Sequence, residues 1–403
     1  MAGVARVAGV AGGPEPLGGV TVVDLSRVLA GPFCTLVLAD LGARVIKVER
    51  PGTGDDARQM GPFIDGQSAY FASVNRGKES IALDLAVAED RVVFEALLGR
   101  ADVLVENFRP GVLDRLGYGW KILAARWPRL ILASVSGFGQ TGPYAERPAY
   151  DMVAQAMGGI MSITGHPGGE PVRVGSSIGD LAAALFCAVG ITSALFARES
   201  TGRGCQVDVS MLDSQVALLE NAIVRYQASA VTPGPLGARH PSITPFGVYR
   251  AGNGTRLVIA AGNDELFDRL CEAVGRPELA TSGDPRFATN ELRCRHWVAL
   301  ESEIEATLSE RPATEWLGLL GAAGIPCAPV NDVAAVVEDA QVLFRRMVVT
   351  LAGGAIPGLK TAGNPIKLSG VDDPAVRAGA PELDRDRATI LGQFDGDHLS
   401  RRR

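Results

Sequence analysis

Residues 134–180 read SVSGFGQTGPYAERPAYDMVAQAMGGIMSITGHPGGEPVRVGSSIGD, a segment in which glycine-rich loops alternate with short apolar runs. A short apolar run at residues 130–135 ends at a glycine-rich loop, residues 136–144, as a parallel strand does when it delivers its carboxyl end to a site. A helix is expected from about Pro148. A second loop rich in glycine and proline follows at residues 164–174. Two such loops at one edge of a sheet predict a pocket.

The same alternation of strand and helix extends along the first half of the chain. We expect strands at residues 20–24, 44–48, 80–85, 102–105 and 206–211, and helices at residues 33–41, 89–98 and 213–227. This pattern predicts an α/β protein with a parallel sheet, whose polar loops after strands form the ligand side. The first turn reads RVLAGPF and lacks the GxGxxG glycines, which argues against NAD binding.

The pattern changes after residue 230. Residues 231–245 are rich in proline and glycine and read as a linker. Two short runs, 246–250 and 256–261, flank AGNG as in a hairpin, and helices are expected at 264–274 and 299–308. We therefore predict a large α/β domain at residues 18–230, the linker at 231–245, a small α+β domain at 246–330, and a C-terminal return to the large domain at 331–403.

Composition excludes several classes of function. The 403 residues carry a net charge of −6, which gives no electrostatic case for a nucleic acid or an anionic membrane surface. The six cysteines have no CxxC or CxxH spacing, so neither a metal site nor a disulfide framework is predicted. The apolar run at residues 181–197 is shorter than a spanning helix and reads as a buried core helix. We expect a soluble cytoplasmic protein.

An ordered series of motifs covers the chain from residue 20 to residue 370. Besides SGFGQTGPY, RPAYD and QAMGG, it includes DLSRVLAGPF, LGARVIKVERPGTGD, NRGKESIALDL, DVLVENFRPGVLDRLGYG and TGRGCQVDVSMLD. This series resembles family III CoA-transferases, the CaiB/BaiF family, to which formyl-CoA transferase and α-methylacyl-CoA racemase also belong. The resemblance implies a doubly wound, Rossmann-like large domain, an intertwined homodimer, and acyl-CoA as a substrate with no permanently bound cofactor.

The resemblance also implies which residues contact coenzyme A. The positions that match the family's nucleotide-binding loops are Val28, Ala30, Arg50, Leu83, Asn107, Phe108 and Arg115. These residue types suit the ligand, because arginine pairs with phosphate groups and apolar side chains flank an adenine.

In the resembled transferases an aspartate three residues after a TG pair attacks the acyl thioester. Here Gly168 occupies that position, and Glu170 follows two residues later. Glu170 is therefore one candidate for the catalytic carboxylate, and a surface loop glutamate is the alternative reading. His166 in the same loop either orients the substrate or faces water.

Asp151 and Asp180 are the other two candidate catalytic residues. Asp180 matches the aspartate of the racemase branch, whose histidine position holds Tyr150 in this chain. Ser177 and Asp180 also have capping-box spacing, and Asp151 lies where a helix dipole favours an acid. We expect a transferase that moves CoA between carboxylic acids through a carboxylate-bound intermediate. An acyl-CoA racemase or epimerase, and a non-catalytic acyl-CoA-binding protein, are the alternatives.

Overall fold

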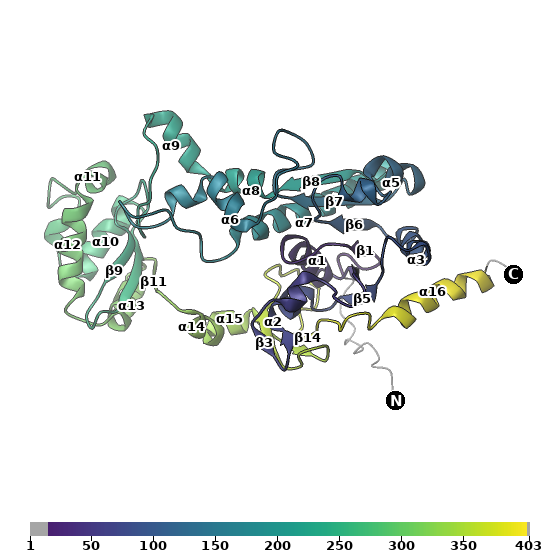
Figure 1. Ribbon diagram of the computed structural model, residues 1–403. Coiled ribbons are helices and arrows are strands. Elements are labelled where there is room, and N and C mark those ends of the chain that lie inside the picture. Colours follow the sequence, from purple (N-terminus) through teal and green to yellow (C-terminus); the bar gives the residue numbers. More distant parts are fainter. Residues whose placement is uncertain (1–14, 401–403) are drawn as a thin grey trace. The chain divides into compact units, whose positions relative to one another are not determined.

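The computed structural model describes residues 15–400, with side chains described up to residue 394. The chain divides into two compact units. The first unit comprises residues 15–160, 173–227 and 340–400, and the second comprises residues 161–172 and 228–339. Figure 1 shows the helices and strands of both units, coloured along the sequence.

A six-stranded parallel sheet is the centre of the first unit. Its strands, in spatial order, are β5 (Glu79–Ala82), β2 (Arg44–Glu49), β1 (Thr21–Asp24), β6 (Val103–Glu106), β7 (Ile131–Ser136) and β8 (Gln206–Ser210). The chain builds outward from β1 in one direction and then from β6 in the other. This order is that of a doubly wound sheet, and it places the topological switch point between β1 and β6. The predicted parallel α/β fold is confirmed.

Helices cover both faces of this sheet, because successive strand residues face opposite sides. Val22 packs with α1 (Ala30–Asp40) and with the long helix α7 (Ile178–Thr201), which contact each other. Val23 packs on the other face with α3 (Ala88–Leu98). Further cover on that second face comes from α4 (Val112–Arg115), α5 (Trp120–Arg126) and the C-terminal helix α16 (Arg387–Ser400).

The remaining elements of the first unit are short. They are η1 (Asp56–Gln59), β3 (Phe63–Ile64), β4 (Gln67–Ser68), α2 (Ala69–Asn75), α6 (Asp151–Met157), η2 (Ile160–Ile163, which extends beyond the unit boundary), α8 (Met211–Leu218), α9 (Asn221–Ser229, which also crosses it), α15 (Ala340–Phe344), β12 (Val348–Ala352), β13 (Lys360–Ala362) and β14 (Val376–Ala378). The C-terminal segment returns to the sheet of this unit, since the Asp386 carboxylate accepts a hydrogen bond from the Ser80 N–H at 2.9 Å.

The second unit contains a three-stranded antiparallel sheet, in the order β11 (Cys327–Pro329), β10 (Arg256–Ala260), β9 (Phe246–Arg250). The expected hairpin around AGNG is β9 paired with β10. The other elements are α10 (Asp264–Ala273), η3 (Pro277–Leu279), α11 (Asn290–Arg295), α12 (Trp297–Leu308), α13 (Ala313–Ala322) and α14 (Val333–Glu338). Phe267 and Leu300 lie in its own hydrophobic core.

Two expected helices differ from the structure. The helix expected at residues 213–227 is two helices, α8 and α9, because Glu220 between them has a left-handed backbone with φ of 46°. The helix expected at residues 181–197 is longer, and only one side is buried: Phe196 is 85% exposed. Among residues 15–400, α7 alone is long and apolar enough to cross a membrane, and 44% of its most apolar window is buried inside the protein. Apolar helices in the core of soluble proteins also reach this length and hydropathy.

Candidate active site

Two neighbouring cavities lie at the carboxyl ends of the parallel strands in the first unit. The first cavity has a volume of about 600 Å³ and lies beside the loops after β1, β2, β5 and β6. Three of its lining residues, Arg50, Leu83 and Phe108, are predicted coenzyme A contacts. The cavity therefore lies where a doubly wound sheet binds its ligands, outside the switch point.

The second cavity has a volume of about 240 Å³. The predicted residues Val28, Ala30, Asn107 and Asp180 line it, together with Tyr150 and the loop after β7. Both cavities share a further set of lining residues, namely Arg27, Phe108 and Arg109. An elongated ligand could therefore have one end in each cavity.

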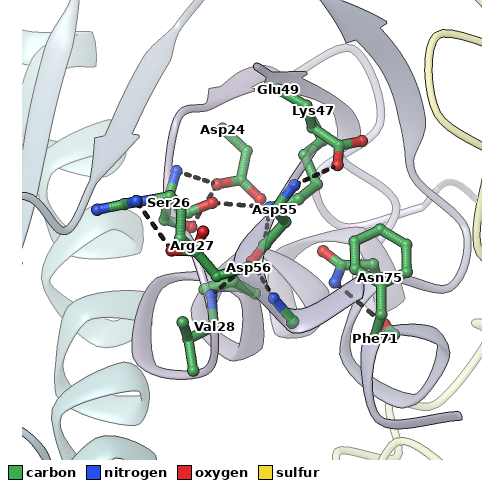
Figure 2. Close-up of polar contacts among 12 residues, drawn as sticks. Asp24, Ser26, Arg27, Val28, Lys47, Glu49, Asp55, Asp56, Phe71 and Asn75 are labelled. Atoms are coloured by element: carbon green, nitrogen blue, oxygen red, sulfur yellow. Dashed lines mark hydrogen bonds and ion pairs between the residues drawn. The ribbon is translucent and has the colours of Figure 1, made fainter. Parts of the chain in front are cut away.

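The loop after β1 is clamped in an unusual conformation where it borders the second cavity. Val28 has φ of 67°, which is a strained backbone for a β-branched residue. Its N–H donates to Asp55 Oδ1 at 3.0 Å, and the Arg27 N–H donates to Asn107 Oδ1 at 2.8 Å. Asn107 Nδ2 donates back to the Arg27 carbonyl oxygen at 2.8 Å. Neighbouring loops thus hold this backbone in place (Figure 2).

Buried charged side chains also hold the Val28 loop in place. Lys47 on β2 forms an ion pair with Asp55 at 2.8 Å, and both side chains are almost fully buried. Burial alone would raise the pKa of Asp55, but the Lys47 ammonium and the backbone N–H groups lower it below its usual value. Figure 2 shows Asp24, Lys47 and Asp55 close together beside the loop that carries Arg27 and Val28.

A second buried lysine completes the network. Lys78 lies 3.0 Å from the Asp24 carboxylate, and neither side chain is exposed. Burial lowers the pKa of Lys78 to about 8, although Asp24 opposes this effect. Lys78 and Lys47 hold the pKa of Asp24 well below its usual value against the effect of burial.

Asp151 has both carboxylate oxygens occupied. Oδ1 accepts from the Gly179 N–H at 2.8 Å, in the first turn of α7, and Oδ2 accepts from Gln155 Nε2 at 2.8 Å. Arg173 lies 3.8 Å away. Asp151 therefore anchors the start of α7, as a helix dipole favours.

Asp180 differs from Asp151, although it lies in the first turn of α7, next to the Gly179 that Asp151 contacts. Its carboxylate has no hydrogen bond or ion pair with any residue in the range 15–400, and it lines the second cavity. Ser177 is the N-cap of α7 but makes no side-chain capping bond, so the capping box is not formed. Burial, and secondarily the charge of Asp151, raise the pKa of Asp180 to about 7.

The other predicted residues lie elsewhere. Glu170 is exposed and belongs to the second unit, so its catalytic role stays a prediction. Gly168 in the same loop has φ of 71°. Arg115 is exposed at the end of α4 and lines neither cavity, so its contact with coenzyme A also stays a prediction.

Sequence reasoning missed three basic residues at the site. Arg109 is in the ENFRPG motif, directly after two predicted contacts, and lines both cavities. Arg147 is in the RPAYD motif and lines the second cavity. Lys47 interrupts an otherwise apolar strand, RVIKVE, and a lysine there signals a buried anionic partner.

The chain is similar to known proteins over almost its whole length. The family model described as CoA-transferase family III matches residues 17–387. The chain is 49% identical to an acetyl-CoA:oxalate CoA-transferase of Acetobacter aceti, over 94% of this chain and 96% of the relative. It is 40% identical to a succinyl-CoA:glutarate CoA-transferase of Mus musculus, over 88% and 81% of the two chains.

Solved structures show the same fold. A CAIB/BAIF family protein from Brucella suis superposes with a TM-score of 0.83 at 38% identity, over 94% of this chain and 99% of that one. Rv3272 from Mycobacterium tuberculosis has a TM-score of 0.82 at 30% identity, with 94% and 99% covered. The fold, the site and these relatives define an enzyme of the CoA-transferase class. The chain belongs to CoA-transferase family III, which confirms the predicted family and enzyme class.

Proposed function

We propose that this enzyme transfers coenzyme A from an acyl-CoA to a free carboxylic acid, with Asp180 as the carboxylate that reacts. The observation that carries this proposal is the Asp180 side chain, which lines the second cavity without a hydrogen-bond partner in the described chain. Asp151 is less suited because both of its oxygens hold other groups. Asp56 also lines this cavity, but it is paired with Arg27 and Arg50.

The coenzyme A nucleotide would occupy the first cavity. Arg50 and Arg109 there suit its phosphate groups, and Leu83 and Phe108 suit the faces of its adenine. The pantetheine arm would then pass the Val28 loop and bring the thioester into the second cavity. The rigid clamp on Val28 would fix this path, because a pre-organised loop places reacting groups without a further loss of entropy.

The chemistry would proceed in two reversible halves. The Asp180 carboxylate attacks the acyl carbonyl carbon, the C–S bond breaks, and an aspartyl–acyl anhydride and the CoA thiolate result. The thiolate then attacks the aspartyl carbon, which releases the donor acid and leaves an aspartyl-CoA thioester. The acceptor carboxylate repeats these steps in reverse order, so that the new acyl-CoA leaves and Asp180 is regenerated. Each half balances, and no redox partner is needed.

Label exchange tests this proposal. Purified enzyme is incubated with acetyl-CoA and one ¹⁴C-labelled acid at a time, and labelled acyl-CoA is measured. We expect exchange by the wild type, a loss of roughly a thousandfold or more in Asp180→Asn, and little change in the matched control Glu170→Gln. Calorimetry should show that Asp180→Asn still binds CoA, because Asp180 does not line the first cavity.

Three outcomes would overturn the proposal. Full exchange by Asp180→Asn, or its loss in Glu170→Gln alone, would move the chemistry to another carboxylate. Solvent deuterium entering the α-carbon of a 2-methylacyl-CoA without label exchange would indicate a racemase. Binding of CoA esters with neither reaction would indicate a non-catalytic binding protein.

We further propose that two copies form an intertwined homodimer. Helix α7 and its neighbours α6, α8 and α9 carry many exposed apolar side chains, and such large patches mark interfaces. Examples are Met152, Leu185, Phe186, Val189, Phe196 and Val224. The chain also leaves the first unit at residue 227 and returns to it at residue 340, which leaves a long excursion that a partner could thread.

The proposed compartment is the cytoplasm. All six cysteines are free thiols, which suits a reducing environment. Coenzyme A esters would be substrates, and no permanent cofactor is part of the proposed reaction. Within residues 15–400, no group of three or more His, Cys, Asp or Glu side chains is placed to hold a metal ion.

A further inference from the structure

The C-terminal part of the chain covers one edge of the parallel sheet. Strand β5 is the edge strand beside β2, so its outward N–H and C=O groups need other partners. Residues 381–391, which we call the C-terminal strap, provide them. The Ser80 N–H donates to the Asp386 carboxylate at 2.9 Å, and the Ser80 carbonyl oxygen accepts from the Asp386 N–H at 3.0 Å. The strap therefore takes the place of a further strand along this edge.

Two side chains of the strap hold the last residue of β5. The Ala82 N–H donates to Asp384 Oδ1 at 2.7 Å, and an Arg387 N–H donates to the Ala82 carbonyl oxygen. Asp384 and Arg387 also pair with each other at 2.8 Å. Ile390, three residues further on, is buried in the same hydrophobic core as Leu83, which keeps the strap against the sheet. Both backbone polar groups of Ala82 are thus fixed from outside the sheet.

Ala82 directly precedes one wall of the first cavity. The next four residues, 83–86, all line this cavity. The Leu83 N–H donates to the Glu49 carbonyl oxygen at 2.8 Å, so β2 holds the start of the wall from one side. The strap holds it from the other side through Ala82. The position of the wall therefore depends on the two strap side chains that bind Ala82.

A second contact joins the strap to the residues around the cavity. The Pro381 carbonyl oxygen accepts a hydrogen bond from Arg58 at 3.1 Å. Arg58 forms an ion pair with Glu49 at 2.7 Å, and Glu49 lines the first cavity. Glu49 also accepts from the N–H of Asp55, the residue that holds Val28. The strap thus supports the surroundings of the first cavity at two points.

We propose that Asp384 and Arg387 are positioning residues for coenzyme A, which hold the wall at residues 83–86 in the conformation that binds the adenine ring. This inference rests on the placement of the nucleotide in the first cavity under the proposed function. Neither side chain lines either cavity, so both act through Ala82. A wall that is fixed before the ligand arrives need not be ordered on binding, so loosening it lowers the affinity.

Calorimetry with a fragment of coenzyme A tests the wall alone. Adenosine 3′,5′-bisphosphate is the nucleotide part of coenzyme A with one phosphate fewer, and it lacks the pantetheine arm. Arg387→Gln should weaken its binding and that of CoA by about 3- to 30-fold, the range for one or two charged hydrogen bonds. Arg387→Lys should recover part of the affinity, because an ammonium group can still donate to the Ala82 carbonyl oxygen.

Arg44→Gln is the matched control. Arg44 pairs with Glu79 at 2.6 Å and donates to Gln393 in α16 at 2.8 Å, so this variant also breaks an ion pair at the sheet edge and a contact with the C-terminal helix. The two arginines are similarly exposed, at 29% for Arg44 and 36% for Arg387. Arg44 is the first residue of β2, at the end of the sheet opposite the cavity. The control should therefore keep the CoA affinity of the wild type.

Kinetics give a readout that a general loss of folded enzyme would not give. Arg387→Gln should raise KM for acetyl-CoA by about 3- to 30-fold at nearly unchanged kcat, and leave turnover of S-acetylpantetheine, which has no nucleotide, nearly unchanged. Equal losses with both donors, or unchanged affinity for adenosine 3′,5′-bisphosphate, would overturn the inference. If Arg50→Ala also left that affinity unchanged, the nucleotide placement would fall with it. A wild type whose nucleotide binding depends on Arg387 but which exchanges no label would leave the inference standing and refute the proposed function.

Discussion

Replacing Asp55 with asparagine should destabilise the protein and loosen the Val28 loop. Asp55 Oδ1 accepts from the Val28 and Ala57 N–H groups, and Oδ2 faces the Lys47 ammonium at 2.8 Å. An asparagine would have to place its NH₂ group against a donor in either orientation. It would also leave Lys47 without its ion-pair partner in a buried position, and such losses cost about 3–5 kcal/mol. The field of Asp24 offsets part of this cost, so we expect about 2–4 kcal/mol.

Urea unfolding followed by far-UV circular dichroism measures this change. The matched control is Asp372→Asn, which breaks an exposed pair with Arg346 at 4.0 Å and should change the free energy of unfolding by less than about 1 kcal/mol. A double-mutant cycle with Lys47→Met should show coupling, with the double variant less destabilised than the sum of the two single variants. Stability of Asp55→Asn within about 1 kcal/mol of the wild type would refute the argument that the buried pair holds the loop.

Three further predictions concern ligand binding, pH and assembly. Arg50→Ala should weaken CoA binding by about 1.5–3 kcal/mol, the range of a charge-assisted hydrogen bond, and unchanged affinity in calorimetry would remove Arg50 from the site. The pKa of Asp180 is raised on folding, so the folded state binds its proton more tightly and loses stability as pH rises from about 4 through 7. Asp180→Asn should therefore be more stable than the wild type at pH 8 but not at pH 4. The transferase rate should rise with pH through a pKa near 7. A rise in rate near pH 4 would mean that the reacting carboxylate has an unshifted pKa. Light scattering at micromolar concentration should give the mass of a dimer, and a monomer would contradict the intertwined assembly.

The regular part of the fold could be predicted because its signals are local. The strand expected at residues 130–135 is Ile131–Ser136, since a short apolar run that ends at a glycine-rich loop favours a buried strand. The helix break at Glu220 could not be predicted, because a left-handed glutamate has no sequence signature. The short strands β3 and β4 were also missed, since pairs of two-residue strands form only through tertiary contacts.

The sequence could predict which loops line the site, but not which of their side chains are free to react. Family motifs singled out Val28, Asn107 and Asp180, and all three line one cavity in the structure. The difference between Asp151 and Asp180 required coordinates, because each lies near a helix start and only the structure shows which carboxylate is already hydrogen-bonded. The strained φ of Val28 and its bond to Asp55 likewise depend on contacts between loops 27 residues apart.

Trapping the covalent intermediate would identify the carboxylate that reacts with acyl-CoA. The enzyme is incubated with acyl-CoA, treated with borohydride or hydroxylamine, digested, and analysed by peptide mass. We predict a modification at Asp180 that is absent in Asp180→Asn and present in Glu170→Gln. A modification at Glu170, or turnover with no trapped adduct, would contradict it.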